Sequence, residues 1–296
     1  MPPALPPDAV VYFNGAFRPA ADARFALEER GVLFADGVYE VVRYDAGRPF
    51  AMQPHVDRLA RSLDGIDLQG VDAQALAGLS DELMDRNGLA DAKVYWQVTR
   101  GDAGPRDFFI PAREELTPNV VLIAYPAAPV DRNNDPKPGS GHIVEDCRWT
   151  KCWIKSLMLL PASLAKTAAR RNGAVEAIFE RHKPGYDESH ITEGGSTNVF
   201  VVRDGELHTH PNDGWVLPGI TRDVLLETAQ RDLGLAVREQ TFTAADMLAA
   251  DEVFVCSTTQ LNPLTSIDGT PIGDGKSHPL TTKLHHAYLD RIFAAP

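Results

Sequence analysis

Cysteine is scarce in this chain of 296 residues, and the three present, Cys147, Cys152 and Cys256, are odd in number and lack CxxC spacing. This excludes a disulfide framework and gives no sign of a structural metal site, so we expect a reducing compartment. No apolar run approaches the roughly 20 residues of a membrane span, and the N-terminus has no signal-peptide pattern. The sequence therefore predicts a cytoplasmic protein that does not enter a membrane.

Positive charge is also in short supply, because 29 Lys and Arg face 41 Asp and Glu, for a formal net charge of -12. Such a chain has no general affinity for nucleic acid or an anionic membrane, although a local cationic pocket for one phosphate is compatible with it. Internal repeats and low-complexity tracts are missing as well. The composition, with 44% hydrophobic residues, is that of a globular protein, and the acidic charge makes a small-molecule ligand a better fit than nucleic acid or a membrane.

One proline-rich segment divides the chain. Residues 126–141 hold Pro126, Pro129, Pro136 and Pro138 among Asn, Asp and Gly, which disfavours regular structure and predicts a domain boundary. We expect a small N-terminal α/β domain over residues 1–125, a linker over 126–141 and a large C-terminal domain over 142–296.

Hydrophobic periodicity predicts strands and helices on both sides of this boundary, and hence a mixed α/β (α+β) fold. In the first part we expect strands at 10–13, 37–44, 94–99 and 120–125, and helices at 54–66 and 73–84. In the second part we expect strands at 175–181, 237–242 and 252–256, a hairpin at 199–210, and helices at about 157–171, 220–232 and 280–293.

A single lysine, Lys155, stands in the apolar stretch Cys152-Trp153-Ile154-Lys155-Ser156-Leu157-Met158. A protonated amine is poorly solvated among such neighbours, and desolvation can lower a lysine pKa by up to ~3 to 5 units. A neutral lysine is a nucleophile that forms Schiff bases, which is the chemistry of pyridoxal 5′-phosphate enzymes. The alternative is a surface lysine that reaches water along its own methylene stem.

A polar segment, Thr192-Glu193-Gly194-Gly195-Ser196-Thr197-Asn198, precedes the apolar run 199–202. Its glycines would let the backbone approach a flat ligand. The Glu193 carboxylate would keep a pyridine nitrogen protonated, so that the ring withdraws electrons from a substrate carbanion. A polar turn before a strand is the alternative.

Three further segments indicate a phosphate site. Gly219-Ile220-Thr221 opens a predicted helix, whose free N–H groups and dipole favour an anion. Ser257-Thr258-Thr259 would add donors, and Arg58 would add positive charge. Taken singly, a helix cap and a solvated arginine explain the same residues.

Taken together, these motifs resemble those of the fold type IV pyridoxal phosphate enzymes and, within them, the D-amino-acid aminotransferases. The resemblance extends over nearly the whole chain. It is carried by Glu29-Arg30-Gly31, Asp36-Gly37-Val38-Tyr39-Glu40, His55-Val56-Asp57-Arg58-Leu59, Arg106, Ile154-Lys155-Ser156-Leu157, the 192–198 segment, Gly219-Ile220-Thr221-Arg222 and Ser257-Thr258-Thr259.

The resemblance implies a two-domain fold with the cofactor in the cleft between the domains, in a homodimer. It implies that Lys155 is the catalytic lysine, which binds the cofactor covalently, and that Tyr39 and Arg106 hold the substrate carboxylate. The implied cofactor-binding residues are Lys155, Glu193, Arg58, Ile220, Thr221, Ser257, Thr258, Ser196, Thr197 and Asn198.

Two residues depart from the family pattern. Phe108 stands where the best-known D-amino-acid aminotransferases have a histidine, two residues after the arginine at 106. Losing one donor to a charged group commonly costs ~1.5 to 3 kcal/mol, unless another group such as Arg43 replaces it. Met158 stands where asparagine is frequent in relatives, and we have no account of that change.

The implied reaction transfers the amino group of a D-amino acid, such as D-alanine or D-glutamate, to a 2-oxo acid such as pyruvate or 2-oxoglutarate. Lys155 would serve first as covalent anchor and then as general base and acid. Branched-chain L-amino-acid aminotransferases, (R)-selective amine transaminases and 4-amino-4-deoxychorismate lyase share this lysine, glutamate and phosphate site, so these activities stay open. A non-catalytic sensor of a phosphate ligand is the alternative from another class.

Overall fold

The computed structural model describes residues 5–112, 116–258, 260–276 and 278–293. The chain forms two compact units: unit 1 comprises Met1–Val130 and Ile154–Met158, and unit 2 comprises Asp131–Trp153 and Leu159–Pro296. The fold is mixed α/β in two units, as the sequence predicts. The short segment 154–158, placed with the C-terminal domain in the sequence analysis, contacts unit 1 because it pairs with a strand there.

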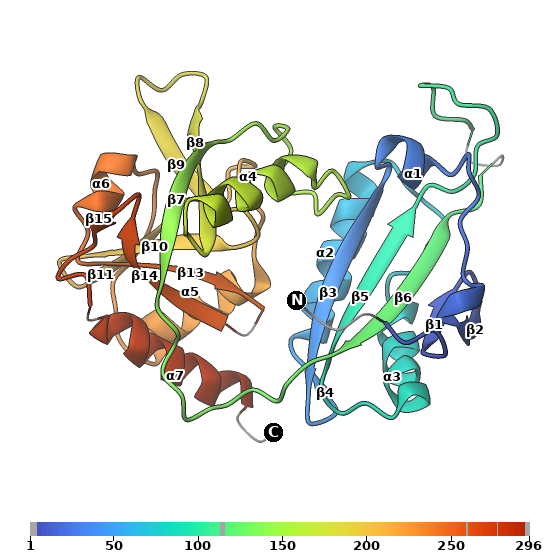
Figure 1. The fold of residues 1–296 in the computed structure, drawn as a ribbon, viewed down its shortest axis with the longest axis horizontal. Helices are drawn as coiled ribbons and strands as arrows, with labels where there is room; N and C mark the ends of the chain where they lie inside the picture. Colours follow the sequence, from blue (N-terminus) through green and yellow to red (C-terminus); the bar gives the residue numbers. More distant parts are fainter. Residues whose placement is uncertain (1–4, 113–115, 259, 277, 294–296) are drawn as a thin grey trace. The chain divides into compact units, whose positions relative to one another are not determined.

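Unit 1 is built on a six-stranded antiparallel sheet in the order β2-β1-β6-β5-β3-β4 (Figure 1). Its elements are β1 (Val10–Phe13), β2 (Ala16–Pro19), the 3-10 turn η1 (Ala20–Asp22), α1 (Arg30–Phe34), β3 (Gly37–Asp45), β4 (Arg48–Pro49), α2 (Met52–Gly65), α3 (Ala75–Asn87), β5 (Ala92–Thr99) and β6 (Asn119–Pro126).

Helices α2 and α3 pack against one face of this sheet (Figure 1). The strands alternate, so that Tyr44 and Trp96 point to the helices and donate hydrogen bonds to Asp81 and Ser80 of α3, both at 2.7 Å. Gly88 ends α3 in the left-handed region at φ 62°, a common helix stop. The opposite face of β3 and β5 carries Tyr39 and its neighbours.

Unit 2 is built on a nine-stranded mixed sheet, with the path β12-β11-β10-β13-β14-β7-β8-β9 and β15 paired to β14. Its elements are β7 (Gly139–Glu145), α4 (Leu160–Arg171), β8 (Glu176–His182), β9 (Ser189–Gly194), β10 (Asn198–Arg203), β11 (Glu206–Thr209), α5 (Ile220–Arg231), β12 (Val237–Glu239), α6 (Ala244–Leu248), β13 (Glu252–Ser257), β14 (Gln260–Ile267), β15 (Thr270–Pro271) and α7 (Pro279–Phe293).

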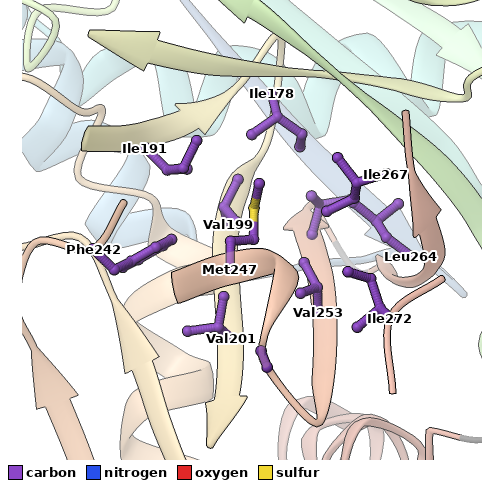
Figure 2. Packing of buried hydrophobic residues seen from close by; sticks show 12 residues of the cluster. Ile178, Ile191, Val199, Val201, Phe242, Met247, Val253, Leu264, Ile267 and Ile272 are labelled. Atoms are coloured by element: carbon purple, nitrogen blue, oxygen red, sulfur yellow. The ribbon is translucent and has the colours of Figure 1, made fainter. Parts of the chain in front are cut away.

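The sheet of unit 2 curls around an apolar core, and β9 at one end of the path lies beside β10. Figure 2 shows this core, in which Met247 of α6 reaches toward strand residues such as Val199 and Val253, with Phe242 at one side. On the outer side of β8, Phe179 packs on α4 instead. The end of β9 and the start of β10 are joined directly within the polar 192–198 segment.

The sequence predicted most of these elements but missed several of them. Helix α4 begins at Leu160 rather than near 157, because residues 154–158 pair with β3 and Pro161 suits the first turn. Strand β7 begins at Gly139, inside the segment expected to be linker, and Glu193 lies on strand β9 rather than in a turn. Within the described ranges, none of the helices has the length and apolar character needed to cross a bilayer.

Candidate functional site

Lys155 is held along the edge of β3 by backbone hydrogen bonds. The Tyr39 N–H donates to Lys155 O (2.9 Å) and the Leu157 N–H donates to Gly37 O (3.0 Å). The Lys155 N–H donates to the Ser62 hydroxyl of α2 (3.1 Å). A Cβ at position 37 would lie 2.5 Å from Val98 O of β5 and 2.8 Å from Leu157 Cδ1, so only glycine fits between β5 and this segment.

The Lys155 side chain lies against an aromatic face. Its Nζ is 4.4 Å from the centre of the Tyr39 ring, and the Tyr39 and Tyr95 rings are 5.7 Å apart. Burial raises the pKa of Tyr95, which keeps its phenol neutral. The apolar stretch after Lys155 does not enclose it, because Met158 is 47% and Leu160 69% exposed. The neighbours that matter come from β3 and β5, and the sequence analysis missed Tyr95.

Arg58 of α2 is paired with a buried carboxylate. Its Nε and Nη2 donate to the two Glu40 oxygens at 2.7 and 2.8 Å, and His55 Nδ1 donates to the same carboxylate at 2.8 Å. Burial alone would raise the pKa of Glu40, but Arg58 and His55 outweigh it and hold the pKa well below its usual range. The role expected for Arg58, binding a phosphate, stays a prediction.

His55 has one nitrogen left over. Burial lowers the pKa of the ring, which favours the neutral form with the proton on Nδ1, the atom that faces Glu40. Nε2 is then an acceptor, and it is buried without a hydrogen-bond partner among the described residues. A buried acceptor of this kind is satisfied by a ligand or water that brings a donor.

Arg106 lies in the exposed connection between β5 and β6. Its guanidinium carbon is 5.0 Å from the centre of the Phe34 ring and 4.9 Å from that of Phe108. Arg43 does not replace the missing histidine donor, because it is buried, donates to Ala128 O and lies 3.6 Å from Asp45. A proposed carboxylate site in unit 1 therefore relies on Arg106 and Tyr39.

Glu193 is the centre of a buried network in unit 2. Its Oε1 accepts from Arg148, and its Oε2 accepts from the Leu217 N–H (3.0 Å) and from Asn198 Nδ2 (3.1 Å). Burial raises the pKa of Glu193, and Arg148 together with the Leu217 N–H opposes the rise. A buried carboxylate that is both paired and basic is a suitable partner for a protonated ring nitrogen.

Arg148, which the sequence analysis missed, is itself held by Asp146. Arg148 and Arg181 both lie 2.8 Å from the Asp146 carboxylate, and Thr192 donates to it at 3.1 Å. Burial would raise the pKa of Asp146, but the two arginines lower it to about 2. Asp146 and Arg148 directly follow β7, a strand that begins inside the expected linker and that the sequence analysis did not predict.

The first turn of α5 is a buried helix N-terminus. Ile220 and Thr221 are 8% and 5% exposed, and the N-cap residue Gly219 makes no side-chain hydrogen bond to the turn. A Cβ at position 219 would lie 2.0 Å from Asn198 Oδ1, so only glycine fits beside that amide. Buried N–H groups at a helix start need an acceptor, and an anion supplies one.

The remaining predicted residues fall into two groups. Ser257 and Thr258 follow Cys256, which pairs with Asn198 across β10 and β13, whereas Thr259 lies outside the described residues. The other group surrounds the buried Glu176 carboxylate, where Lys166 donates to Glu176 (3.0 Å) and to the Ser196 hydroxyl (2.9 Å), and Thr197 donates to Glu176 (3.2 Å). Ser196 and Thr197 are thus bonded to side chains outside the Glu193 network.

The chemistry of these groups fits pyridoxal 5′-phosphate at each of its three functional ends. The primary amine of Lys155 matches the aldehyde, the Glu193 carboxylate matches the ring nitrogen, and the uncapped start of α5 matches the phosphate. Lys155, Tyr39, Arg58 and Arg106 belong to unit 1, and the other predicted residues belong to unit 2.

Comparisons with known proteins also indicate an aminotransferase. The chain is 40% identical to D-alanine aminotransferase from Listeria innocua over 276 residues, which cover 93% of each chain. It is 37% identical to the enzyme of that name from Staphylococcus aureus over 285 residues, or 94% of this chain and 96% of the relative.

A solved structure extends the comparison. A branched-chain amino acid aminotransferase from Escherichia coli superposes with a TM-score of 0.85 at 26% identity and covers 96% of this chain and 95% of its own. Residues 37–267 match the family described as amino-transferase class IV. The chain therefore belongs to the class IV aminotransferases, whose cofactor is pyridoxal 5′-phosphate.

Proposed function

We propose that this protein is a pyridoxal 5′-phosphate-dependent transaminase that moves the amino group of D-amino acids, of the D-alanine and D-glutamate type, to 2-oxo acids such as pyruvate or 2-oxoglutarate. The choice of substrate rests on one observation, the 40% identity to D-alanine aminotransferase over 93% of the chain. The branched-chain enzymes share the fold at lower identity, 26% for the Escherichia coli protein.

Lys155 is the proposed catalytic residue. When bound, the cofactor supplies an electron-poor ring that stabilises negative charge on the substrate Cα. The Lys155 amine takes the proton from Cα as a general base, a role that needs the amine free of strong ionic partners. Among the described residues, the amine contacts the Tyr39 ring rather than a carboxylate, which is consistent with that role.

Glu193 and the start of α5 hold the two other ends of the cofactor in this proposal. Glu193 keeps the ring nitrogen protonated, and Arg148, Leu217 and Asn198 keep the carboxylate oriented. The N–H groups of Ile220 and Thr221 receive the phosphate. Arg58 is also assigned to the phosphate, by resemblance.

Tyr39 and Arg106 are proposed to receive the substrate carboxylate. Phe108, in the place of a histidine, supplies an aromatic face rather than a hydrogen bond. This change favours a second candidate, an (R)-amine or mixed-specificity transaminase, because an amine without a carboxylate needs no such donor.

A spectrophotometric half-reaction tests the proposal. The purified protein in its pyridoxal form is mixed separately with D-alanine, L-leucine and (R)-1-phenylethylamine, and we expect D-alanine alone to bleach the absorption band of the bound cofactor. Lys155→Ala should lose the characteristic band and at least ~10³-fold of the activity, because it removes both the covalent anchor and the base. Bleaching by L-leucine or by the amine would assign a sister activity, and no band after addition of the cofactor would refute cofactor binding.

A homodimer and a cytoplasmic location also remain part of this proposal. Both follow from the resemblance and from the cysteine usage rather than from the contacts of one chain. Light scattering during size-exclusion chromatography would distinguish a dimer from the 32.3 kDa monomer.

A further inference from the structure

A second group of buried charged side chains lies in unit 2, in addition to the Glu193 network. Lys183, which follows β8, is 1% exposed, and its Nζ lies 2.6 Å from Asp213 Oδ2 and 2.6 Å from His210 Nε2. We call these three residues the Lys183 cluster. Lysine is rarely buried this completely, and then only when its charge is paired, so the cluster needs an explanation.

Hydrogen bonds fix where the protons lie in the Lys183 cluster. His210 Nδ1 is 2.8 Å from Ile191 O, which can only accept, so Nδ1 carries the proton and Nε2 accepts from Lys183. Burial and the Lys183 charge lower the pKa of His210 to about 4, which keeps the ring neutral at pH 7. Lys183 can therefore donate to His210 and Asp213 at the same time.

The cluster anchors one end of a loop whose other end touches Glu193. Asp213 belongs to the loop 211–218, and its second oxygen, Oδ1, accepts the N–H of Trp215 at 3.2 Å. Two residues further on, the Leu217 N–H donates to Glu193 Oε2 at 3.0 Å. The position of that donor thus depends on how firmly the loop 211–218 is held.

The same loop also contacts Arg181, one of the two arginines that pair with Asp146. The Arg181 guanidinium carbon lies 4.8 Å from the centre of the Trp215 ring, and Arg181 is paired with Asp146 at 2.8 Å. Lys183 Nζ is 5.8 Å from the same ring. The Trp215 ring is therefore close to both Lys183 and Arg181. Its fluorescence should be sensitive to the position of the loop 211–218.

We propose that Lys183 is a positioning residue for Glu193, acting through Asp213 and the loop 211–218. The inference rests on the proposed function only in assigning Glu193 to the ring nitrogen of the cofactor. Without Lys183 the Asp213 anchor is lost, the Leu217 N–H no longer stays in place, and the Glu193 carboxylate loses one of its buried donors. The chemical step slows, whereas substrate binding, which uses other residues, does not weaken.

Kinetics of three variants test this inference: Lys183→Met, Asp213→Asn and the double variant. We expect kcat for D-alanine to fall about tenfold in each, with KM within about twofold, since one charged hydrogen bond is lost. The double variant should be no slower than Lys183→Met, because both residues act as one unit. Arg203→Met is the control, since Arg203 pairs with Asp246 at 2.9 Å and does not contact the loop.

Trp215 gives a second readout that needs no bound cofactor. In the apoprotein, Lys183→Met should shift the Trp215 emission, isolated by subtraction of a Trp215→Phe sample, toward that of a solvated indole, and Arg203→Met should not. An unchanged kcat, or a higher KM at unchanged kcat, in a folded Lys183→Met variant would overturn the inference. If that variant does not fold, the kcat and KM of Asp213→Asn, whose side chain is partly exposed, decide whether the inference holds. Absence of D-alanine turnover in the wild type would refute the proposed function instead, and the emission shift would still test the loop.

Discussion

Phe108 changes how Arg106 is held. Together with Phe34 it places aromatic faces on the guanidinium, and such contacts contribute ~0.5–1 kcal/mol at exposed sites. They orient the guanidinium through its flat face, and among the described residues no hydrogen bond engages its N–H groups. A histidine at position 108 would instead bring a hydrogen bond of its own, so in the proposed carboxylate site recognition would fall more heavily on Arg106.

Arg106→Ala should therefore separate substrates that have a carboxylate from those that do not. We expect kcat/KM for D-alanine to fall by roughly 10- to 100-fold, the equivalent of one lost charged hydrogen bond, and the value for (R)-1-phenylethylamine to change less than about threefold. Arg86→Ala, at an exposed arginine paired with Glu82, is the control. Equal losses on both substrates would remove Arg106 from the carboxylate site.

At the scale of elements, the site depends on where strands and helices end. Glu193 lies near the end of β9, Asn198 opens β10, and α5 begins at Ile220 with its first turn buried. The close approach of Gly219 to Asn198 joins the last two of these ends. A change at this contact should therefore affect both the proposed phosphate site and Glu193.

Gly219→Ala tests that contact. The new Cβ, 2.0 Å from Asn198 Oδ1, would push away the amide that donates to Glu193 and Leu217. Leaving such buried groups unsatisfied costs ~1–3 kcal/mol, so we expect the Kd for pyridoxal 5′-phosphate to rise about 10- to 100-fold in a fluorescence titration. Gly78→Ala is the matched control: it lies in helix α3 with no atom near the added Cβ, so it should stabilise by up to ~1 kcal/mol and leave the Kd unchanged.

At the scale of the whole molecule, buried charge links folding to pH. His210 has a folded pKa of about 4 against 6.5 for an ordinary histidine, so the unfolded chain binds this proton first as the pH falls. The stability that this neutral histidine contributes is complete above about pH 6.5 and is lost progressively down to about pH 4. The full loss amounts to about 3 kcal/mol.

Unfolding at two pH values checks this link. Between about pH 7.5 and about pH 4.5, the wild-type apoprotein should lose about 2 to 3 kcal/mol more stability than His210→Asn, which cannot take up the proton. Denaturant unfolding followed by Trp215 fluorescence measures the difference. The same loss in both proteins would show that other groups dominate the acid sensitivity.

The sequence alone was enough to predict the fold class and most of the elements, and it supplied the residues to which the proposed chemistry is assigned. Lys155, Glu193 and the start of α5 stand in local motifs that, taken together, resemble those of one enzyme family, and period-two and helical patterns need no tertiary information. The sequence analysis did not predict strand β7, because prolines precede it and its buried and exposed residues do not alternate clearly.

Only the tertiary structure decided which side chains meet. Arg148 donates a hydrogen bond to Glu193, Arg58 donates to Glu40, and Lys183 donates to both His210 and Asp213. The two residues of each pair are at least 18 positions apart in the sequence. Such contacts depend on how strands pair and on which face of a strand a residue points to, and no local pattern carries that information. The sequence therefore determined the chemistry of the site, and the packing of the sheets decided how its groups are charged, oriented and supported.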